Sequence, residues 1–206
     1  MSSPYYADDL VTLYHGDCLE VSEWLEADVL VTDPPYGLGD RWQGGGWGSN
    51  PMYADARRWD VKPDDAAMRE LVGDRPAIVW GGNYFALPPS RCWLSWIKNP
   101  FMNTMADFEL AWTSFDRPSK AYVSTRNPDG QRQHPTQKPV ALLEWCIRFM
   151  PPGVVADPFA GSGSTLIAAV NQGRKAIGVE LDERYCELIA KRLSNQTMAL
   201  DFGDAS

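Results

Sequence analysis

Two kinds of apolar segment alternate along the chain. Runs such as 28–32 and Ala77–Trp80 are almost wholly apolar, which is typical of strands buried on both faces of a sheet. Trp93–Lys98 and 108–115 alternate apolar and polar residues, which predicts strands nearer a sheet edge. Further strands are predicted at 10–14, 154–156 and 175–180, and helices at 18–26, 64–72, 140–150, 164–172 and 183–195. Repeated strand–helix units predict an α/β fold, with a mostly parallel sheet and helices on both faces.

Two stretches between these elements show no regular apolar pattern. Residues 37–50 hold six glycines together with Arg41, Trp42 and Trp47, and residues 116–133 are polar and basic. Long irregular connections in a compact domain often carry function. Both stretches are therefore predicted to be surface loops with a binding role. By contrast, residues 18–26 are predicted to bury Leu19, Trp24 and Leu25.

Length and composition fit one domain, 1–206. A chain of 206 residues with 44% hydrophobic content can build a full core. The polar N-terminus does not resemble a signal peptide, and no apolar run approaches the roughly 20 residues of a membrane span, so a cytoplasmic protein is expected. Four cysteines and two histidines are widely spaced. They predict no metal site and no disulfide framework, and the cysteines are expected to be core residues.

The charge of the chain is negative but unevenly distributed. A net charge of −8 by itself disfavours nucleic acid as a partner. Residues 117–138, however, contain five basic residues and only one acid, and Arg41, Arg57 and Arg58 form a second basic group. A basic face on an acidic body therefore remains compatible with DNA binding.

A glycine turn follows one predicted strand. Residues 154–165 read VVADPFAGSGST, so the strand ends in Asp157, and a turn with Gly161 and Gly163 leads into a helix. Glycine lets a ligand approach the backbone closely, and a helix N-terminus offers free N–H groups. The next strand ends in Glu180, and an acid about 20 residues along often binds ribose hydroxyls. The combination predicts a nucleotide-like cofactor site, although the pattern is not that of a nicotinamide cofactor or a triphosphatase.

A second motif ends an earlier strand. Residues 31–36 read VTDPPY, in which an apolar run is followed by Asp33, two prolines and Tyr36. Taken alone, this is compatible with a simple strand-ending turn. The glycine turn farther along the chain changes its meaning.

DPPY at 33–36, HPTQKP at 134–139 and DPFAGSGST at 157–165 together resemble the amino-group DNA methyltransferases that use S-adenosylmethionine. Because DPPY precedes the glycine loop, the order is that of the circularly permuted β-class. WGGNYF, WLSWIK and FELAWTSF look like the intervening strands, so the resemblance covers nearly the whole chain. It implies a Rossmann-like methyltransferase fold, with a seven-stranded, mostly parallel sheet and one antiparallel strand. The small size would suit a phage or prophage enzyme.

The resemblance also implies roles for individual residues. The catalytic motif that holds the target amino group maps onto Asp33, Pro34, Pro35 and Tyr36. The cofactor site maps onto the GDC segment, the catalytic Asp, the HPTQKP segment, the glycine loop and the acid after it: Asp17, Cys18, Asp33, His134, Pro135, Thr136, Lys138, Asp157, Pro158, Phe159, Ala160, Gly161, Ser162, Gly163, Ser164, Thr165 and Glu180.

The chemistry explains these residue types. An exocyclic amine of adenine or cytosine is a poor nucleophile, because its lone pair is delocalised into the ring. Hydrogen bonds to Asp33 and to the Pro34 carbonyl favour the pyramidal form that frees the lone pair, and proline aims that carbonyl with its fixed φ. Tyr36 can stack on a base flipped out of the duplex. Direct transfer needs no covalent intermediate, so positioning and electrostatics are the main tools.

DNA contacts are expected from the two loop regions. The family's recognition region has only about 116–133 available here, which predicts short or relaxed sequence specificity, or reading through the 37–60 region. The candidate DNA-binding residues are Arg41, Trp42, Trp47, Arg57, Arg58, Arg117, Lys120, Arg126 and Arg132. The partner is expected to be double-stranded DNA with one base flipped out, and a homodimer is left open.

Several alternatives remain at this point. Asp33 favours N6 of adenine by family habit, and N4 of cytosine is the first alternative. An RNA or protein amide-nitrogen methyltransferase, a catalytically silent DNA-binding protein and a nicotinamide oxidoreductase are the others.

Overall fold

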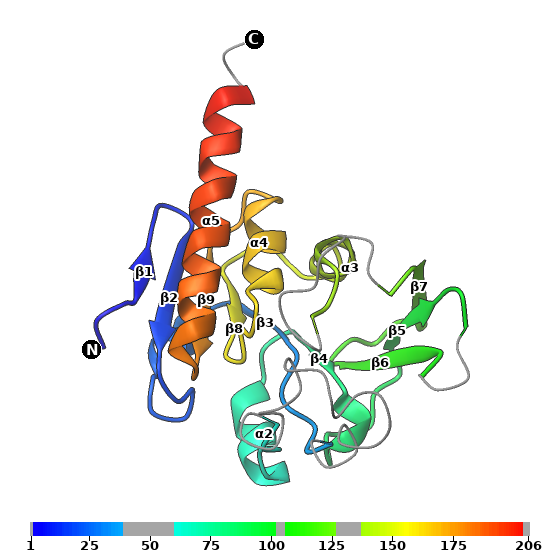
Figure 1. The fold of residues 1–206 in the computed structure, drawn as a ribbon. Helices are drawn as coiled ribbons and strands as arrows, with labels where there is room; N and C mark the ends of the chain where they lie inside the picture. Colours follow the sequence, from blue (N-terminus) through cyan, green and yellow to red (C-terminus); the bar gives the residue numbers. More distant parts are fainter. Residues whose placement is uncertain (1, 39–59, 102–105, 127–136, 204–206) are drawn as a thin grey trace, which may run out of the picture.

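A mixed β-sheet forms the centre of the protein (Figure 1). The computed structural model describes residues 2–38, 60–101, 106–126 and 137–203. Within these residues nine strands lie in the order β1-β2-β9-β8-β3-β4-β6-β5-β7. Their bounds are β1 Tyr6–Ala7, β2 Val11–His15, β3 Val29–Thr32, β4 Ala77–Trp80, β5 Trp93–Lys98, β6 Phe108–Thr113, β7 Lys120–Ser124, β8 Val155–Asp157 and β9 Ala176–Glu180.

The strand count differs from the predicted seven. The strand β6 runs antiparallel to both β4 and β5, which is the one antiparallel strand expected in the interior of the sheet. Two strands extend the edges: β1 pairs antiparallel with β2, and β7 pairs parallel with β5. Neither was predicted, because β1 has two residues and β7 is mostly exposed and polar, so burial left no apolar pattern on them.

Helices cover both faces of the sheet, as the sequence predicts. The helices α3 (Val140–Ile147), α4 (Ser164–Val170) and α5 (Glu183–Gly203) share one core with Val29 and Val31 of β3. On the other face, α2 (Asp65–Val72) and the short 3-10 helix η1 (Glu23–Glu26) pack with Leu30. Alternate residues of β3 therefore enter opposite cores, which explains why its first three residues are all apolar. The 3-10 helix η5 (Gly82–Tyr84) follows β4.

The predicted helix 18–26 is largely absent. Only η1 is helical, and Leu19 and Leu25 are exposed, at 62% and 47% of their surface, whereas Trp24 is fully buried. The Trp24 indole N–H donates to the Cys18 carbonyl at 2.9 Å. That carbonyl would have to accept from the backbone four residues on in an α-helix, so the tryptophan competes with helix formation here.

The four cysteines, Cys18, Cys92, Cys146 and Cys186, are free and buried, as expected of core residues. In the part of the chain that the structure describes, no helix is both long and apolar enough to cross a membrane. The same described residues contain no group of three His, Cys, Asp or Glu side chains placed to hold a metal ion.

Candidate active site

The sheet has a topological switch point between β8 and β3. The chain continues from β8 to β9 on one side, whereas it continues from β3 to β4 on the other. In open α/β sheets, ligands bind in the crevice outside the carboxyl ends of the strands at such a point. Both sequence motifs follow these two central strands, so the fold brings them to the same crevice although about 120 residues separate them.

A cavity of about 950 Å³ lies at this edge. Its wall includes the ends of β2, β9, β8 and β3 and the start of α5. It is large enough for a nucleoside-sized ligand. The predicted site residues that line it are Asp17, Cys18, Asp33, Pro34, Pro35, Tyr36, Pro158, Phe159, Gly161 and Glu180.

The glycine loop forms the floor of the cavity next to β8. Gly163 precedes α4 with φ +79°, and a Cβ there would lie 2.9 Å from Ile189 of α5, so glycine is required both by conformation and by space. The other predicted residues of this segment do not line the cavity. They are buried or half-buried behind its surface and shape the turn: Asp157, Ala160, Ser162, Gly163, Ser164 and Thr165.

Glu180 holds the loop from the neighbouring strand. Its carboxylate accepts the backbone N–H of Gly161 at 2.7 Å and that of Asp182 at 2.8 Å. Burial raises the pKa of Glu180 to about 7, although these two N–H donors act in the opposite direction. The side chain thus lines the cavity as a carboxyl group that titrates near neutral pH.

Asp157 performs a structural task behind the cavity. Its carboxylate accepts the Thr32 hydroxyl at 2.7 Å and the Phe159 N–H at 3.2 Å, which ties the end of β8 to the end of β3. Burial raises its pKa to about 6. Asp17, on the far wall, accepts the Leu19 N–H at 2.9 Å and lines the cavity together with Cys18.

The DPPY loop is fixed by an acid that the sequence did not single out. Asp60 is buried, and its carboxylate accepts the backbone N–H groups of Tyr36 at 2.8 Å, Gly37 at 3.1 Å and Leu38 at 2.5 Å. Three N–H groups on one carboxylate make a rigid loop. No sequence signal marks Asp60, because it acts on backbone groups 22 to 24 residues away.

Tyr36 packs against two residues of the WGGNYF segment. Its ring stacks on Tyr84 with centroids 4.9 Å apart and an interplanar angle of 20°. Gly81 lies against the same ring with φ +63°, and a Cβ there would be 2.0 Å from it. The Tyr36 hydroxyl donates to Oδ1 of Asp33. The loop therefore presents the tyrosine and the aspartate as one unit.

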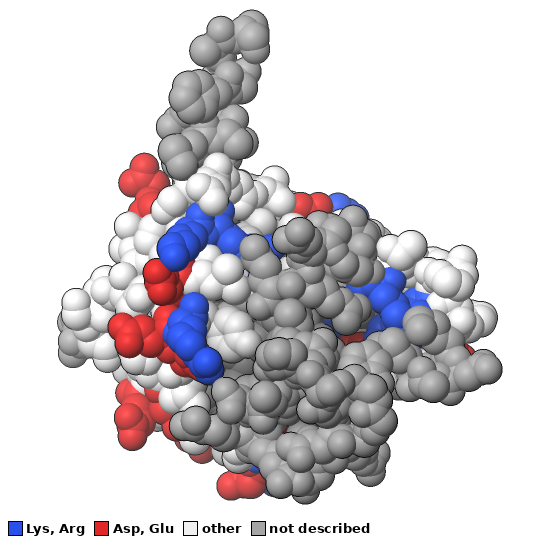
Figure 2. All heavy atoms as spheres, in the orientation of Figure 1, with Lys and Arg blue, Asp and Glu red and all other residues white. Residues whose placement is uncertain are grey.

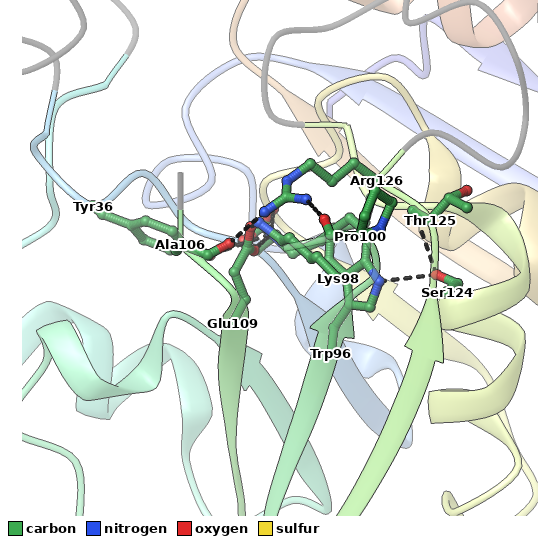
Figure 3. A network of polar contacts seen from close by, with 11 residues as sticks. Tyr36, Trp96, Lys98, Pro100, Ala106, Glu109, Ser124, Thr125 and Arg126 are labelled. Carbon is green, nitrogen blue, oxygen red and sulfur yellow. Dashed lines mark hydrogen bonds and ion pairs between the residues drawn. The ribbon is translucent and has the colours of Figure 1, made fainter. Parts of the chain in front are cut away.

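Lys138 lies against Asp33 rather than among the residues that line the cavity. Its Nζ is 2.6 Å from Oδ2 of Asp33, 3.0 Å from Oε2 of Glu109 and 3.3 Å from the Tyr36 hydroxyl. Glu109 also forms an ion pair with Lys98 (Figure 3). Sequence reasoning missed Glu109 and Lys98. A signal existed, because Lys98 shares the buried face of β5 with Leu94 and Trp96.

The candidate DNA-binding residues are only partly described. The Arg117 guanidinium lies over the rings of Phe115 and Phe149, Lys120 is exposed on β7, and Arg126 donates to two backbone carbonyls. On the face seen in Figure 2, acidic side chains gather toward α2 and β2, while Lys and Arg form separate patches. The predicted residues that lie outside the described ranges are Arg41, Trp42, Trp47, Arg57, Arg58, Arg132, His134, Pro135 and Thr136.

Comparison with known sequences gives a consistent result. A family model described as DNA methylase matches residues 53–192. The type II methyltransferase M2.LlaDCHI of Lactococcus lactis subsp. cremoris is 41% identical, over 94% of this chain and 93% of that protein. The DNA adenine methyltransferase YhdJ of Escherichia coli (strain K12) is 26% identical, over 91% of this chain and 84% of that protein.

Solved structures share the fold. M1.HpyAVI, determined as a complex with SAM, superposes with a TM-score of 0.58 at 22% identity, over 89% of this chain and 99% of that chain. PvuII DNA methyltransferase, described as cytosine-N4-specific, gives a TM-score of 0.59 at 19% identity, over 92% of this chain and 88% of that chain. The arrangement of sheet and helices is therefore one that such enzymes use.

Proposed function

This chain belongs to the DNA methylase family, and we propose that it methylates the exocyclic amino group of a flipped base in DNA, N6 of adenine, with short or relaxed sequence specificity. The observation that carries the proposal is that the DPPY loop and the glycine loop line one cavity. Amino-group methyltransferases of this family take the methyl group from S-adenosylmethionine.

The cavity fits this methyl donor. It is of nucleoside size, and Asp17 and Glu180 place carboxyl groups on its wall where ribose hydroxyls or adenine nitrogens can donate. Gly161 has φ +53°, and the nearest atom to its Cβ position is the Phe159 carbonyl oxygen at 3.9 Å, so the ligand can approach the backbone here. When bound, S-adenosylmethionine supplies a methyl group activated by a positively charged sulfur. Asp17, Cys18, Pro158, Phe159, Gly161 and Glu180 are proposed to hold it.

Asp33 is proposed to accept a hydrogen bond from the target amine. Each oxygen of a carboxylate has two lone pairs. Tyr36 occupies one on Oδ1 and Lys138 one on Oδ2, so each oxygen keeps a lone pair for the amine. As the nitrogen forms its bond to the methyl carbon, the bond from that carbon to the donor's sulfur would break, and the sulfur would leave as a neutral thioether. The nitrogen, now cationic, then gives up one proton, for which the Asp33 carboxylate already hydrogen-bonded to it is the base at hand.

Two further steps of recognition are part of the proposal. The target atom is unreachable inside a duplex, so the base is flipped into the cavity, where Tyr36 offers a face for stacking. Arg41, Trp42 and Trp47 of the glycine-rich stretch 37–50 remain proposed DNA contacts, together with Arg57 and Arg58 of the 37–60 region. The basic residues of 116–133 are proposed to contact phosphate groups.

Adenine is the favoured base. YhdJ, which matches this chain over most of its length, is named a DNA adenine methyltransferase. Asp33 at the head of the motif agrees with family habit. N4 of cytosine is the second candidate, because the PvuII enzyme of this fold is cytosine-N4-specific.

A transfer experiment tests the proposal. The protein is incubated with labelled S-adenosylmethionine and unmodified DNA, RNA or protein, and the methylated unit is identified after digestion. We expect label in N6-methyladenine of DNA. Label in N4-methylcytosine would leave the reaction class intact but refute the base assignment, and label only in RNA or protein would refute the proposal.

The Asp33→Ala variant tests the catalytic residue in the same assay. It should abolish transfer while leaving the affinity for S-adenosylmethionine largely unchanged. Asp9→Ala, which removes an exposed carboxylate on the turn between β1 and β2, is the matched control. Transfer by Asp33→Ala at the wild-type rate would refute the assignment.

A further inference from the structure

Four charged side chains of alternating sign, two buried lysines and two half-buried acids, form a chain behind the DPPY loop. They are Asp33 after β3, Lys138 before α3, Glu109 on β6 and Lys98 at the end of β5. Figure 3 shows Tyr36 reaching this cluster from one side, with Glu109 and Lys98 carried on adjacent strands. The two lysine side chains are only 4% and 8% exposed. Lysine is almost never buried this far unless it is paired for a reason.

We propose that Lys138 and Glu109 are positioning residues for methyl transfer: Lys138 keeps the Asp33 carboxylate ionised and oriented, and Glu109, neutralised by Lys98, holds the Lys138 ammonium in place. The inference rests on the proposed function of Asp33 as the acceptor for the amine. It adds Glu109, Lys98 and a non-cofactor role for Lys138 to the DPPY motif.

The geometry assigns each member a distinct contact. Lys138 has three N–H donors, and it directs them at Asp33, Glu109 and the Tyr36 hydroxyl. Its ammonium also lies 5.4 Å from the centre of the Trp80 ring, which excludes water on that side. Without Glu109, one of these donors would lose its partner in a buried site, and Lys138 could turn away from Asp33.

An acceptor at this position needs such support. The pKa of Asp33 stands above its ordinary value. Burial raises it most, the Lys138 ammonium lowers it, the Glu109 carboxylate raises it and the Tyr36 hydroxyl lowers it. A protonated Asp33 would have a donor where the amine needs an acceptor. Lys138 is thus the main group that keeps the carboxylate charged, and it must outweigh the second carboxylate that holds it.

Several other titratable groups of the described residues lie around this site. Tyr36 and Tyr84 come from the DPPY and WGGNYF segments, and burial raises the pKa of Tyr36 well above 10, so it remains a donor. The negative charge of Asp33, on the neighbouring strand, adds to the rise in the pKa of Asp157 of β8. Burial raises the pKa of the Cys146 thiol on α3, and the positive charge of Lys138 acts in the opposite direction. Burial acts to raise the pKa of Glu109, yet Lys138 and Lys98 lower it to about 2, so this carboxylate stays charged.

The experiment measures turnover against pH for four variants. In Lys138→Met, the Asp33 carboxylate lies near Glu109 and has lost the Lys138 ammonium that separated the two acids. The acid limb of the kcat profile should therefore shift to higher pH by about 2 units. On that limb, turnover would be about 100-fold below wild type. In the double variant Lys138→Met/Glu109→Gln the second carboxylate is gone, so the limb should return toward the wild-type position. Glu109→Gln alone should lower the plateau without raising the limb, and Glu109→Asp should restore part of it.

A second readout is independent of turnover. The Asp33 carboxylate is followed by carbon-13 NMR against pH, assigned by its absence in Asp33→Asn, in the wild type, in Lys138→Met and in the double variant. Its titration should move up in the single variant and back in the double. The exposed pair Lys191 and Glu187, changed to Met and Gln, is the matched control and should leave both readouts unchanged.

The outcomes separate the two proposals. If wild type methylates an amino group but the Asp33 titration is the same in all variants, the positioning role is wrong and the proposed function stands. A double variant whose limb stays with that of Lys138→Met also refutes the role. If wild type methylates no amino group, the proposed function fails, and the NMR titration still decides whether Lys138 and Glu109 set the charge of Asp33.

Discussion

Carboxylates stand at the ends of adjacent parallel strands, but their partners differ between β3 on one side of the switch point and β8 and β9 on the other. Asp33 after β3 is balanced by a lysine in direct contact. Asp157 and Glu180, at the ends of β8 and β9, receive hydroxyl and backbone N–H donors instead, and within the described residues neither has an ion pair. Burial accordingly raises the pKa of Asp157 to about 6 and that of Glu180 to about 7.

The difference follows from the chemistry expected on each side. A carboxylate that accepts a hydrogen bond from an amine about to become cationic must be ionised when the amine attacks the methyl group. A carboxyl group that only fastens strands, or binds neutral hydroxyls, can be held by neutral donors at lower cost, because no lysine has to be buried with it. The half in which a lysine pairs with the acid is therefore the half in which we propose the chemistry.

The largest expected effect tests this contrast directly. Asp33→Asn removes the charge with little change of shape, and kcat should fall roughly 10²–10³-fold, the usual cost of losing a preorganised electrostatic contact. Asp157→Asn is the comparison, and it should change kcat by much less, because it replaces a carboxyl that is already easy to protonate. Single-turnover kinetics with both variants measure the difference. Equal losses would show that the two acids are not distinguished in this way.

A smaller effect is expected at the acid that fixes the DPPY loop. Asp60→Ala leaves three backbone N–H groups without their acceptor, and the free energy of unfolding should fall by about 1–3 kcal/mol. Turnover should fall roughly 10–100-fold, because the loop loses its orientation. Denaturant unfolding and steady-state kinetics check both numbers. Unchanged turnover in a destabilised variant would mean that the loop is held by other contacts.

The affinity for the cofactor should depend on pH, because Glu180 in the cavity wall is held only by neutral N–H donors. The pKa of Glu180 is about 7, and its ionised form is the better acceptor for ribose hydroxyls. Affinity for S-adenosylmethionine should therefore rise with pH through 7, by roughly tenfold between pH 6 and pH 8. Calorimetry at several pH values measures it. Glu180→Gln should flatten the dependence, and a slope that persists in that variant would assign it to another group.

The smallest effect is expected at the stacked rings of Tyr36 and Tyr84. Tyr84→Leu removes the ring stacked on Tyr36, and such a pair contributes about 0.5–1.5 kcal/mol. We expect a roughly 2–10-fold loss in kcat/KM for DNA, since the Tyr36 ring loses its fixed orientation. Tyr84→Phe keeps the ring and is the control. An equal loss in both variants would point to the Tyr84 hydroxyl rather than to stacking.

Most of the α/β pattern was predictable from the sequence because buried strands carry wholly apolar residues. Ala77–Trp80 and Trp93–Lys98 have the predicted bounds, and the helices on both faces lie where periodicity placed them. The failures share a cause. The strand β7 is exposed and so carries no apolar signal, and the predicted helix at 18–26 gave way to a side chain-to-backbone bond from Trp24 to Cys18.

The two motifs were readable because each is local. A glycine turn needs consecutive residues, and the DPPY segment holds its own acid, prolines and tyrosine, so their chemistry is written in a few adjacent positions. That the two motifs lie side by side could be seen only from the order of the strands in the sheet. The switch point between β8 and β3 sets the ends of two strands side by side, and no local pattern specifies that.

The support behind those motifs was decided only by tertiary structure. Asp60, Tyr84, Lys98 and Glu109 support the DPPY loop from separate segments. Of these, only Lys98 has a sequence signal, its place on the buried face of β5. The sequence determined which residues could hold a methyl donor and an amine. The folded sheet determined which acid stays charged, because that depends on burial and on a lysine 105 positions away from Asp33.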